Sequence, residues 1–110
     1  MPFTLSGVPN EIPTRFTSGN RNKTIMLHCN LVGPASYTTG GETYATLAKA
    51  LGLTSIEYLS GHVTSGVNRS ITHDAANDKI LAFGATGSQE SGSADLSTLT
   101  YSTLVIGTAP

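Results

Sequence analysis

Residues 67–86 read VNRSITHDAANDKILAFGAT, and this stretch decides the fold. Two strand-like runs, VNRSITHD and KILAFGAT, flank the four residues 75–78, and Asp74 can cap the intervening turn with its side chain. Short runs rich in β-branched and aromatic residues on either side of such a turn are typical of a β-hairpin. The stretch therefore predicts two antiparallel strands.

The segments around the hairpin extend the same pattern. Residues 24–32, TIMLHCNLV, place four apolar side chains on one face, and their partial continuity predicts a central strand. Residues 99–107, LTYSTLVIG, predict a final strand. Residues 55–63, SIEYLSGHV, predict another strand, in which alternate side chains lie on opposite faces. One face would carry Ile56, Tyr58, Ser60 and His62, and the other Glu57, Leu59, Gly61 and Val63. About six short strands at this spacing predict an all-β fold, an antiparallel β-sandwich or jelly-roll-like domain.

One short helix interrupts the strands. In residues 45–53, ATLAKALGL, Leu47, Ala48 and Leu51 recur at helical spacing, and Gly52 occupies the position that ends many helices. Two turns of helix are marginal in isolation, so packing must hold this segment in place. We expect it to close one open end of a sandwich or barrel.

The first 22 residues differ from the rest of the chain. Pro2, Pro9 and Pro13 argue against a helix and against a central strand, yet the segment is too apolar for a disordered tail. We therefore expect an extended N-terminal arm over residues 1–22, followed by the β-domain over residues 23–110. The arm lies either on its own domain or on a neighbouring subunit. Its candidate partner-binding residues are Phe3, Leu5, Val8, Ile12, Arg15 and Phe16.

Composition narrows the function classes. The 110 residues carry a net charge of −1 with 12% charged residues, and Ser and Thr make up about a quarter of the chain. The scattered basic residues do not form the footprint that nucleic-acid binding needs. No segment approaches the roughly 20 apolar residues of a membrane span, and the N-terminus lacks a signal-peptide pattern. Cys29 is the single cysteine, so we expect the cytoplasm or a particle assembled there.

Motifs for chemistry are absent from the sequence. His28, His62 and His73 have no partners at metal-ligand spacing, and the neighbours His28 and Cys29 point to opposite faces of a strand. The seven acidic residues are dispersed, and neither a nucleophile elbow nor a phosphate-binding loop is present. We expect no catalytic residues, no metal, no cofactor and no enzymatic activity.

An ordered set of signatures resembles a known group of proteins. A turn Tyr-x-Thr-Gly-Gly at residues 37–41 leads to a helix ending Leu-Gly-Leu and a strand beginning Ser-Ile-Glu. The hairpin Asp-x-x-x-Asp-Lys-Ile-Leu-Ala at residues 74–82 follows, then Asp-Leu-Ser at residues 95–97 and a final strand ending Val-Ile-Gly. Across about two-thirds of the chain, this order resembles small structural proteins of tailed bacteriophages, the capsid decoration or cement proteins.

The resemblance implies a structural protein on the exterior of a phage capsid, assembled in the host cytoplasm. Its implied partners are the major capsid protein and other copies of itself, as a trimer or dimer. The resemblance does not cover residues 1–22. The alternative is a receptor- or glycan-binding module of a phage tail or fibre, which would need exposed aromatic residues. Most of the seven aromatic residues here occupy positions typical of a core or an interface.

Overall fold

The computed structural model describes residues 3–12, 23–64 and 68–109, and these residues form a mostly β structure with one short helix. The all-β class and the short helix are thereby confirmed. In chain order the elements are β1 (Thr4–Ile12), β2 (Lys23–Val32), β3 (Glu42–Thr43), α1 (Ala45–Ala50), β4 (Ser55–Val63), β5 (Ser70–Asp74), β6 (Lys79–Phe83) and β7 (Thr100–Ala109).

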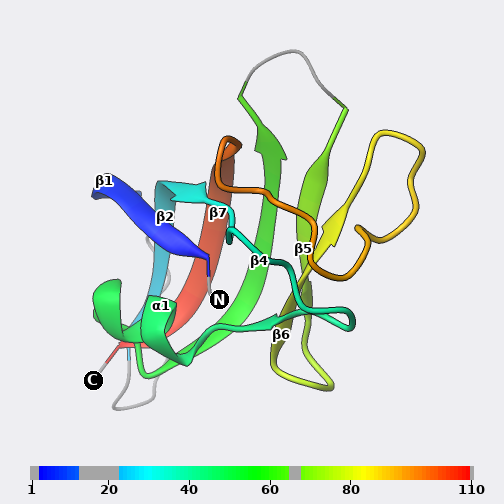
Figure 1. Cartoon of the computed structure of the whole chain (residues 1–110). Helices are drawn as coiled ribbons and strands as arrows, with labels where there is room; N and C mark the ends of the chain where they lie inside the picture. Colours follow the sequence, from blue (N-terminus) through cyan, green and yellow to red (C-terminus); the bar gives the residue numbers. More distant parts are fainter. Residues whose placement is uncertain (1–2, 13–22, 65–67, 110) are drawn as a thin grey trace.

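The strands form one continuous antiparallel sheet in the order β1-β2-β7-β4-β5-β6-β3. The sheet curls around its inner face (Figure 1). Strand β7 pairs with β2 on one side and with β4 on the other, so the last strand of the chain is an interior strand of the sheet. Because β4 also pairs with β5, the ladder passes without a break from one half to the other. The division into two sheets that defines a sandwich is not confirmed.

The predicted hairpin is present as strands β5 and β6. The two strands pair from Ser70↔Phe83 to Asp74↔Lys79. Asp74 holds the turn, because its carboxylate accepts a hydrogen bond from the side-chain amide of Asn77 at 3.0 Å. Asp78 has a positive φ of 53°, a conformation that Asp and Asn tolerate better than most residues. The turn chemistry that the sequence indicated is the chemistry found.

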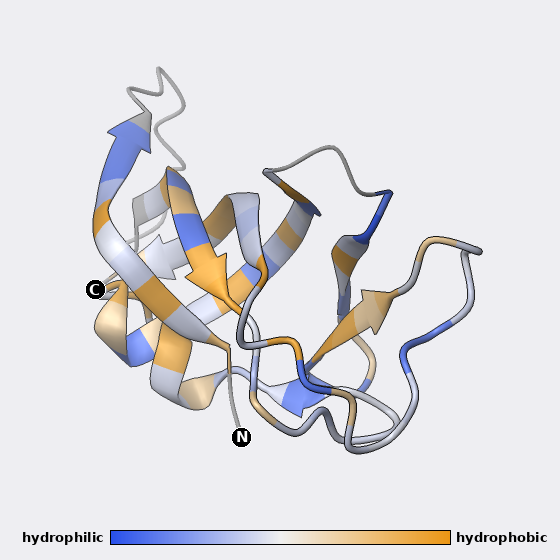
Figure 2. Ribbon diagram, turned by 45° about the horizontal axis from the view of Figure 1, so that its top comes forward, coloured by the Kyte–Doolittle hydropathy of each residue, from blue (hydrophilic) through white to orange (hydrophobic). Residues whose placement is uncertain are grey.

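Hydrophobic and hydrophilic residues alternate along the strands (Figure 2), and the buried hydrophobic residues form one core on the inner face. The central strands contribute the most deeply buried side chains, among them Leu31, Ile71, Tyr101 and Val105. Helix α1 adds Leu47 and Ala48 to the same core. The helix follows edge strand β3 directly in the chain and contacts edge strand β1, so it lies between the two edges of the curled sheet.

Helix α1 ends as the sequence predicts. Gly52 follows the helix with a φ of 75°, and its amide donates a hydrogen bond to the carbonyl of Lys49. The amide of Leu53 reaches back to the carbonyl of Ala48 at 2.9 Å. These two bonds form a Schellman motif, which satisfies carbonyls that a helix end would otherwise leave unpaired.

Simple alternation fails within β4. The pairing with β7 shifts register between Ile56 and Tyr58, so Glu57 is an extra residue at a β-bulge. The bulge places Ile56 on the same inner face as Leu59 and Gly61, all three of which are buried. The prediction that Ile56 shares a face with Tyr58 is therefore wrong. Tyr58 points outward and is 47% exposed.

Candidate functional site

The described part of the predicted N-terminal arm lies on its own domain. Strand β1 pairs with β2, and Phe3 is buried against Tyr101, with ring centroids 5.7 Å apart in an edge-on arrangement. Leu5 is partly buried against the same core, whereas Val8 is 88% exposed.

The other candidate residues of the arm are only partly within the described structure. Ile12 ends β1 opposite Met26, and its side chain lies outside the described set. Arg15 and Phe16 lie outside the described residues. The structure thus brings Phe3 and Leu5 together in the core and places Val8 apart from them.

Val8 is exposed because β1 bulges away from β2. Ser6 pairs with Asn30 and Asn10 pairs with His28, so three residues of β1 oppose the single residue Cys29. Gly7 has a φ of 76°, which permits the sharp bend. A bulge with a proline beside it is a common way to keep an edge strand from pairing with another chain. The edge of β1 is therefore a poor template for strand addition.

The outer face of the sheet carries an apolar row across three adjacent strands. Met26 on β2 pairs with Ile106 on β7, which pairs in turn with Tyr58 on β4. All three alternate with core residues and point away from the inner face, and each is partly or largely exposed. Leu104 lies two residues from Ile106 on the same face of β7. We call these four residues the outer apolar row.

Polar residues flank the outer apolar row on the same face. The next pairs along the strands bring His28 beside Leu104, and the His28 ring nitrogen Nε2 lies 2.8 Å from the Ser102 hydroxyl in a hydrogen bond. Cys29 faces the opposite way and is buried, so His28 and Cys29 cannot share one ligand. His28 thus has a structural hydrogen bond on the outer face.

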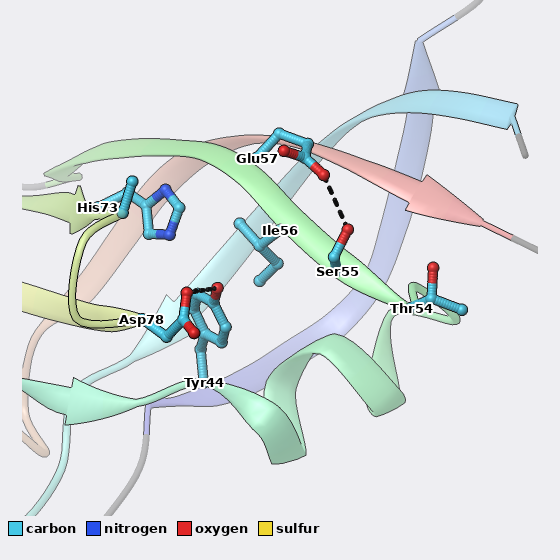
Figure 3. A pocket seen from close by; sticks show the side chains of 8 residues that line it. Tyr44, Thr54, Ser55, Ile56, Glu57, His73 and Asp78 are labelled. Atoms are coloured by element: carbon cyan, nitrogen blue, oxygen red, sulfur yellow. Dashed lines mark hydrogen bonds between the residues drawn. The ribbon is translucent and has the colours of Figure 1, made fainter.

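A pocket opens where β4 and β5 separate. The two strands pair only from Ser60↔Thr72 to His62↔Ser70, and the first half of β4 diverges from the hairpin below that point. The separation leaves a pocket of about 350 Å³. Its lining residues are Tyr44, Thr54, Ser55, Ile56, Glu57, His73, Ala75 and Asp78 (Figure 3).

Hydroxyl groups around this pocket donate to fixed acceptors. The Tyr44 hydroxyl donates to the Asp78 carboxylate at 2.9 Å, and the Ser55 hydroxyl donates to the Glu57 carboxylate at 2.8 Å. The Thr54 hydroxyl donates to the carbonyl of Thr108 at 2.8 Å. A hydroxyl has one hydrogen to give, so each of these oxygens can only accept a further hydrogen bond.

The pocket is electronegative. Burial raises the pKa of Tyr44 to about 12, and the hydrogen bond that its hydroxyl donates to Asp78 and the charges of Asp78 and Glu57 act in the same direction. Both carboxylate charges therefore reach the Tyr44 oxygen, and Tyr44 keeps its proton at neutral pH. Among the described residues, neither carboxylate has an ion pair. An anion would be repelled here, and a hydrogen-bond donor would be attracted.

His73 forms one aromatic side of the pocket. Its ring stacks at a tilt on Tyr44, with centroids 5.3 Å apart. Its Nε2 atom is buried and has no hydrogen-bond partner in the described structure. Within residues 3–12, 23–64 and 68–109, no group of three or more His, Cys, Asp or Glu side chains could hold a metal ion. The arrangement fits binding of a small polar group.

Sequence reasoning missed the pocket. Tyr44 precedes α1, Glu57 lies on the bulge of β4, and His73 and Asp78 lie on the hairpin. Their meeting depends on where β4 separates from β5 and on the register shift that sets the position of Glu57, and no local pattern in the sequence predicts either. Only the positive φ of Asp78 could have been suspected from the sequence, because Asp78 is the last residue of the turn before Lys79.

Comparison of the chain with models of known protein families, with curated proteins and with solved structures found no match. Over the ranges that the structure describes, no helix is long and apolar enough to cross a membrane.

Proposed function

We propose that the chain is a non-enzymatic structural protein of a bacteriophage virion, which binds the outside of the capsid and stabilises contacts between major capsid subunits. The outer apolar row carries this proposal. Met26, Ile106 and Tyr58 form a continuous apolar strip on a sheet face, while α1 packs on the inner face of the same sheet. Apolar strips rimmed by polar residues are a feature of protein-binding surfaces.

The sequence signatures over residues 37–107 support the same function. They define the turn before α1, the helix end, the hairpin and the final strand, and they resemble the capsid decoration proteins of tailed phages in this order. The structure places the last of these signatures, residues 105–107, on β7. One of its residues, Ile106, is at the centre of the outer apolar row.

The low charge of the chain suits attachment to a large repeating surface. A partner contact made by apolar and hydroxyl groups depends less on ionic strength than one made by salt bridges. Contacts that are individually weak gain effective concentration when one protein binds a lattice at several points. We expect the protein to be a homo-oligomer on the particle, a trimer or a dimer, in contact with the major capsid protein.

A binding assay on assembled capsids tests the proposal. Heads that lack the protein are mixed with purified wild type, and occupancy is measured by sedimentation and gel densitometry. The variant Tyr58→Glu places a charge at the β4 end of the outer apolar row, next to Ile106, so we expect its apparent affinity to fall by about tenfold or more. The control Ala85→Glu places the same charge in the exposed turn after β6, outside the outer apolar row and the candidate residues of the arm, and should retain wild-type occupancy.

The two variants separate the possible results. Both side chains are exposed, so both variants should keep the wild-type melting temperature. If Tyr58→Glu decorated heads at full occupancy, the outer apolar row would not be the contact surface. Failure of the wild type to bind heads at any concentration would overturn the capsid function itself.

A further inference from the structure

We propose that the pocket between β4 and the β5–β6 hairpin binds an organic cation, the ammonium of a lysine or the guanidinium of an arginine, carried by the partner protein. The identity of that partner as a capsid subunit rests on the proposed function. The chemical class of the ligand follows from the pocket alone.

The pocket offers acceptors and few donors. The hydroxyls of Tyr44, Ser55 and Thr54 have each given their hydrogen to an oxygen of the chain. The carboxylates of Asp78 and Glu57 have no hydrogens to give when ionised. In the described structure each carboxylate also keeps one oxygen without a hydrogen-bond donor, Oδ2 of Asp78 and Oε2 of Glu57. A complementary ligand must therefore be rich in donors and poor in acceptors.

Lysine and arginine side chains meet this requirement. An ammonium has three donors and a guanidinium five, and neither has an acceptor. Hydrogen bonds between such cations and carboxylates are about twice as strong as those between neutral groups. The aliphatic stem of either side chain also needs apolar contacts, and Ile56 and Ala75 supply them within the same lining.

Other ligand classes fit less well. A phosphate or carboxylate would meet two carboxylates of like charge, Glu57 and Asp78. A sugar presents several hydroxyls and pairs best with a site that donates as well as accepts. The pocket hydroxyls have no hydrogen left to donate, and a neutral His73 ring carries only one N–H. A calcium ion takes about six to eight oxygen ligands, whereas the described residues hold no group of three metal-binding side chains.

Glu57 connects the pocket to the outer face of the sheet, where the outer apolar row lies. Glu57 accepts a hydrogen bond from the Thr108 hydroxyl at 3.2 Å, and Thr108 lies two residues beyond Ile106 on the outer face of β7. Glu57 also directly precedes Tyr58 in the chain. One partner surface with a basic side chain beside an apolar strip would occupy both features at once.

Titration with small probes tests the ligand class. The probes are Nα-acetyl-lysine methylamide and its arginine counterpart, with the neutral norleucine derivative and glucose as comparisons. Nuclear magnetic resonance follows the ring protons of Tyr44 and His73 and the methyl group of Ala75. We expect saturable shifts with the two cationic probes, with dissociation constants on the order of millimolar, and none with norleucine. Binding of glucose alone would overturn the proposal in favour of a glycan site.

Matched variants test the two carboxylates. Asp78→Asn keeps a residue type that tolerates the positive φ, and Glu57→Gln keeps an oxygen to accept from Ser55 and Thr108. Each removes one negative charge and should weaken the cationic probes by about tenfold or more. Asp95→Asn removes the same charge from an exposed turn outside the pocket and should leave binding unchanged. If all three variants lost affinity for the cationic probes equally, the loss would come from the change in net charge, and the proposed site would be overturned.

The capsid assay separates this inference from the proposed function. If Asp78→Asn fails to bind the probes yet decorates heads at full occupancy, the pocket binds cations but is not used on the capsid. If neither cationic probe binds while the wild type decorates heads, the pocket proposal falls and the capsid function stands. Self-association is measured by sedimentation at the probe-titration concentration. Loss of a dimer or trimer in Asp78→Asn would identify the basic side chain as one from a second copy, against the capsid source.

Discussion

Gly61 lies on the inner face of β4, where β7 passes close to it. A Cβ atom at this position would meet the Thr103 hydroxyl oxygen at 2.6 Å and the carbonyl oxygen of Ser102 at 3.0 Å. Thr103 is fully buried and donates its hydroxyl to the carbonyl of Tyr101, so it has little freedom to move. We expect Gly61→Ala to lower the free energy of unfolding by about 1–3 kcal/mol, measured by urea denaturation.

A second substitution isolates the steric cause. Thr103→Ala removes the oxygen that the new Cβ would strike, so the double variant Gly61→Ala/Thr103→Ala should lose less stability than the sum of the two single losses. Additive losses would show that the close approach to Thr103 is not the reason for glycine at position 61.

Cys29 couples the stability of the core to alkaline pH. Its side chain is 2% exposed, and burial raises the pKa of the thiol from 9.0 to about 11. Below pH 9 the thiol keeps its proton in both the folded and the unfolded chain, so it does not lower the free energy of unfolding. As the pH rises from 9 to 11 the unfolded chain loses its proton first, so the free energy of unfolding should fall by about 2–3 kcal/mol.

The variant Cys29→Ala tests whether the thiol is the source of this pH dependence. Burial also raises the pKa of Tyr101 from 10.0 to about 12, so without the thiol the fall in stability should begin nearer pH 10. Urea denaturation at a series of pH values measures both profiles. Identical profiles for the wild type and the variant would rule out the thiol as the source.

Strand β1 is where the predicted arm and the observed fold diverge. The prolines and apolar residues of positions 1–22 predicted an extended segment, and β1 is extended, but its pairing with β2 could not be inferred from alternation. The bulge at Gly7–Pro9 adds two residues and keeps the same face inward, but the inward positions after Leu5 are Gly7, Pro9 and Glu11, so no apolar alternation runs through the segment. Of the two placements left open by the sequence, residues 3–12 take the one on their own domain.

Two substitutions on β1 measure how firmly the strand is docked. Phe3 is 1% exposed and packs edge-on against Tyr101, so Phe3→Ala should lower the free energy of unfolding by about 3 kcal/mol. Val8→Ala on the same strand should change stability by less than about 0.5 kcal/mol, because Val8 is 88% exposed. Chemical denaturation compares the two. A loss for Phe3→Ala no larger than that for Val8→Ala would mean that β1 is not held by the core.

The other elements show how far local patterns reach. The hairpin, the helix with its terminal Gly52 and the strands around residues 24–32 and 99–107 were predictable, because each has a local signal in turn chemistry or periodicity. The order of strands was not, because β2 and β7 pair across most of the chain length, as in Cys29↔Thr103. The bulge at Glu57 reverses the alternation of β4, and it is also what places Tyr58 on the outer face.

At the scale of the whole molecule, apolar side chains lie on both faces of the sheet. With 38% hydrophobic residues the chain fills one inner core, and strands β2, β4 and β7 leave the outer apolar row on the other side. The candidate site was invisible to motif searching because it consists of such a row and a pocket formed by strand divergence. Both arise from register, which only the complete sheet defines.

The two parts of the proposed contact should respond differently to salt. At about 1 M ionic strength the screening length is near 3 Å, so a cation in the pocket beside Asp78 and Glu57 would lose much of its attraction. Contact through Met26, Ile106 and Tyr58 is apolar and would persist. Between about 0.1 M and about 1 M NaCl we expect the affinity of the wild type for heads to fall several-fold without complete release. Asp78→Asn should start lower and depend less on salt, because the ionic part of its contact is already reduced. Occupancy measured by sedimentation across the salt series gives both slopes, and complete release of the wild type at high salt would identify an ionic contact instead.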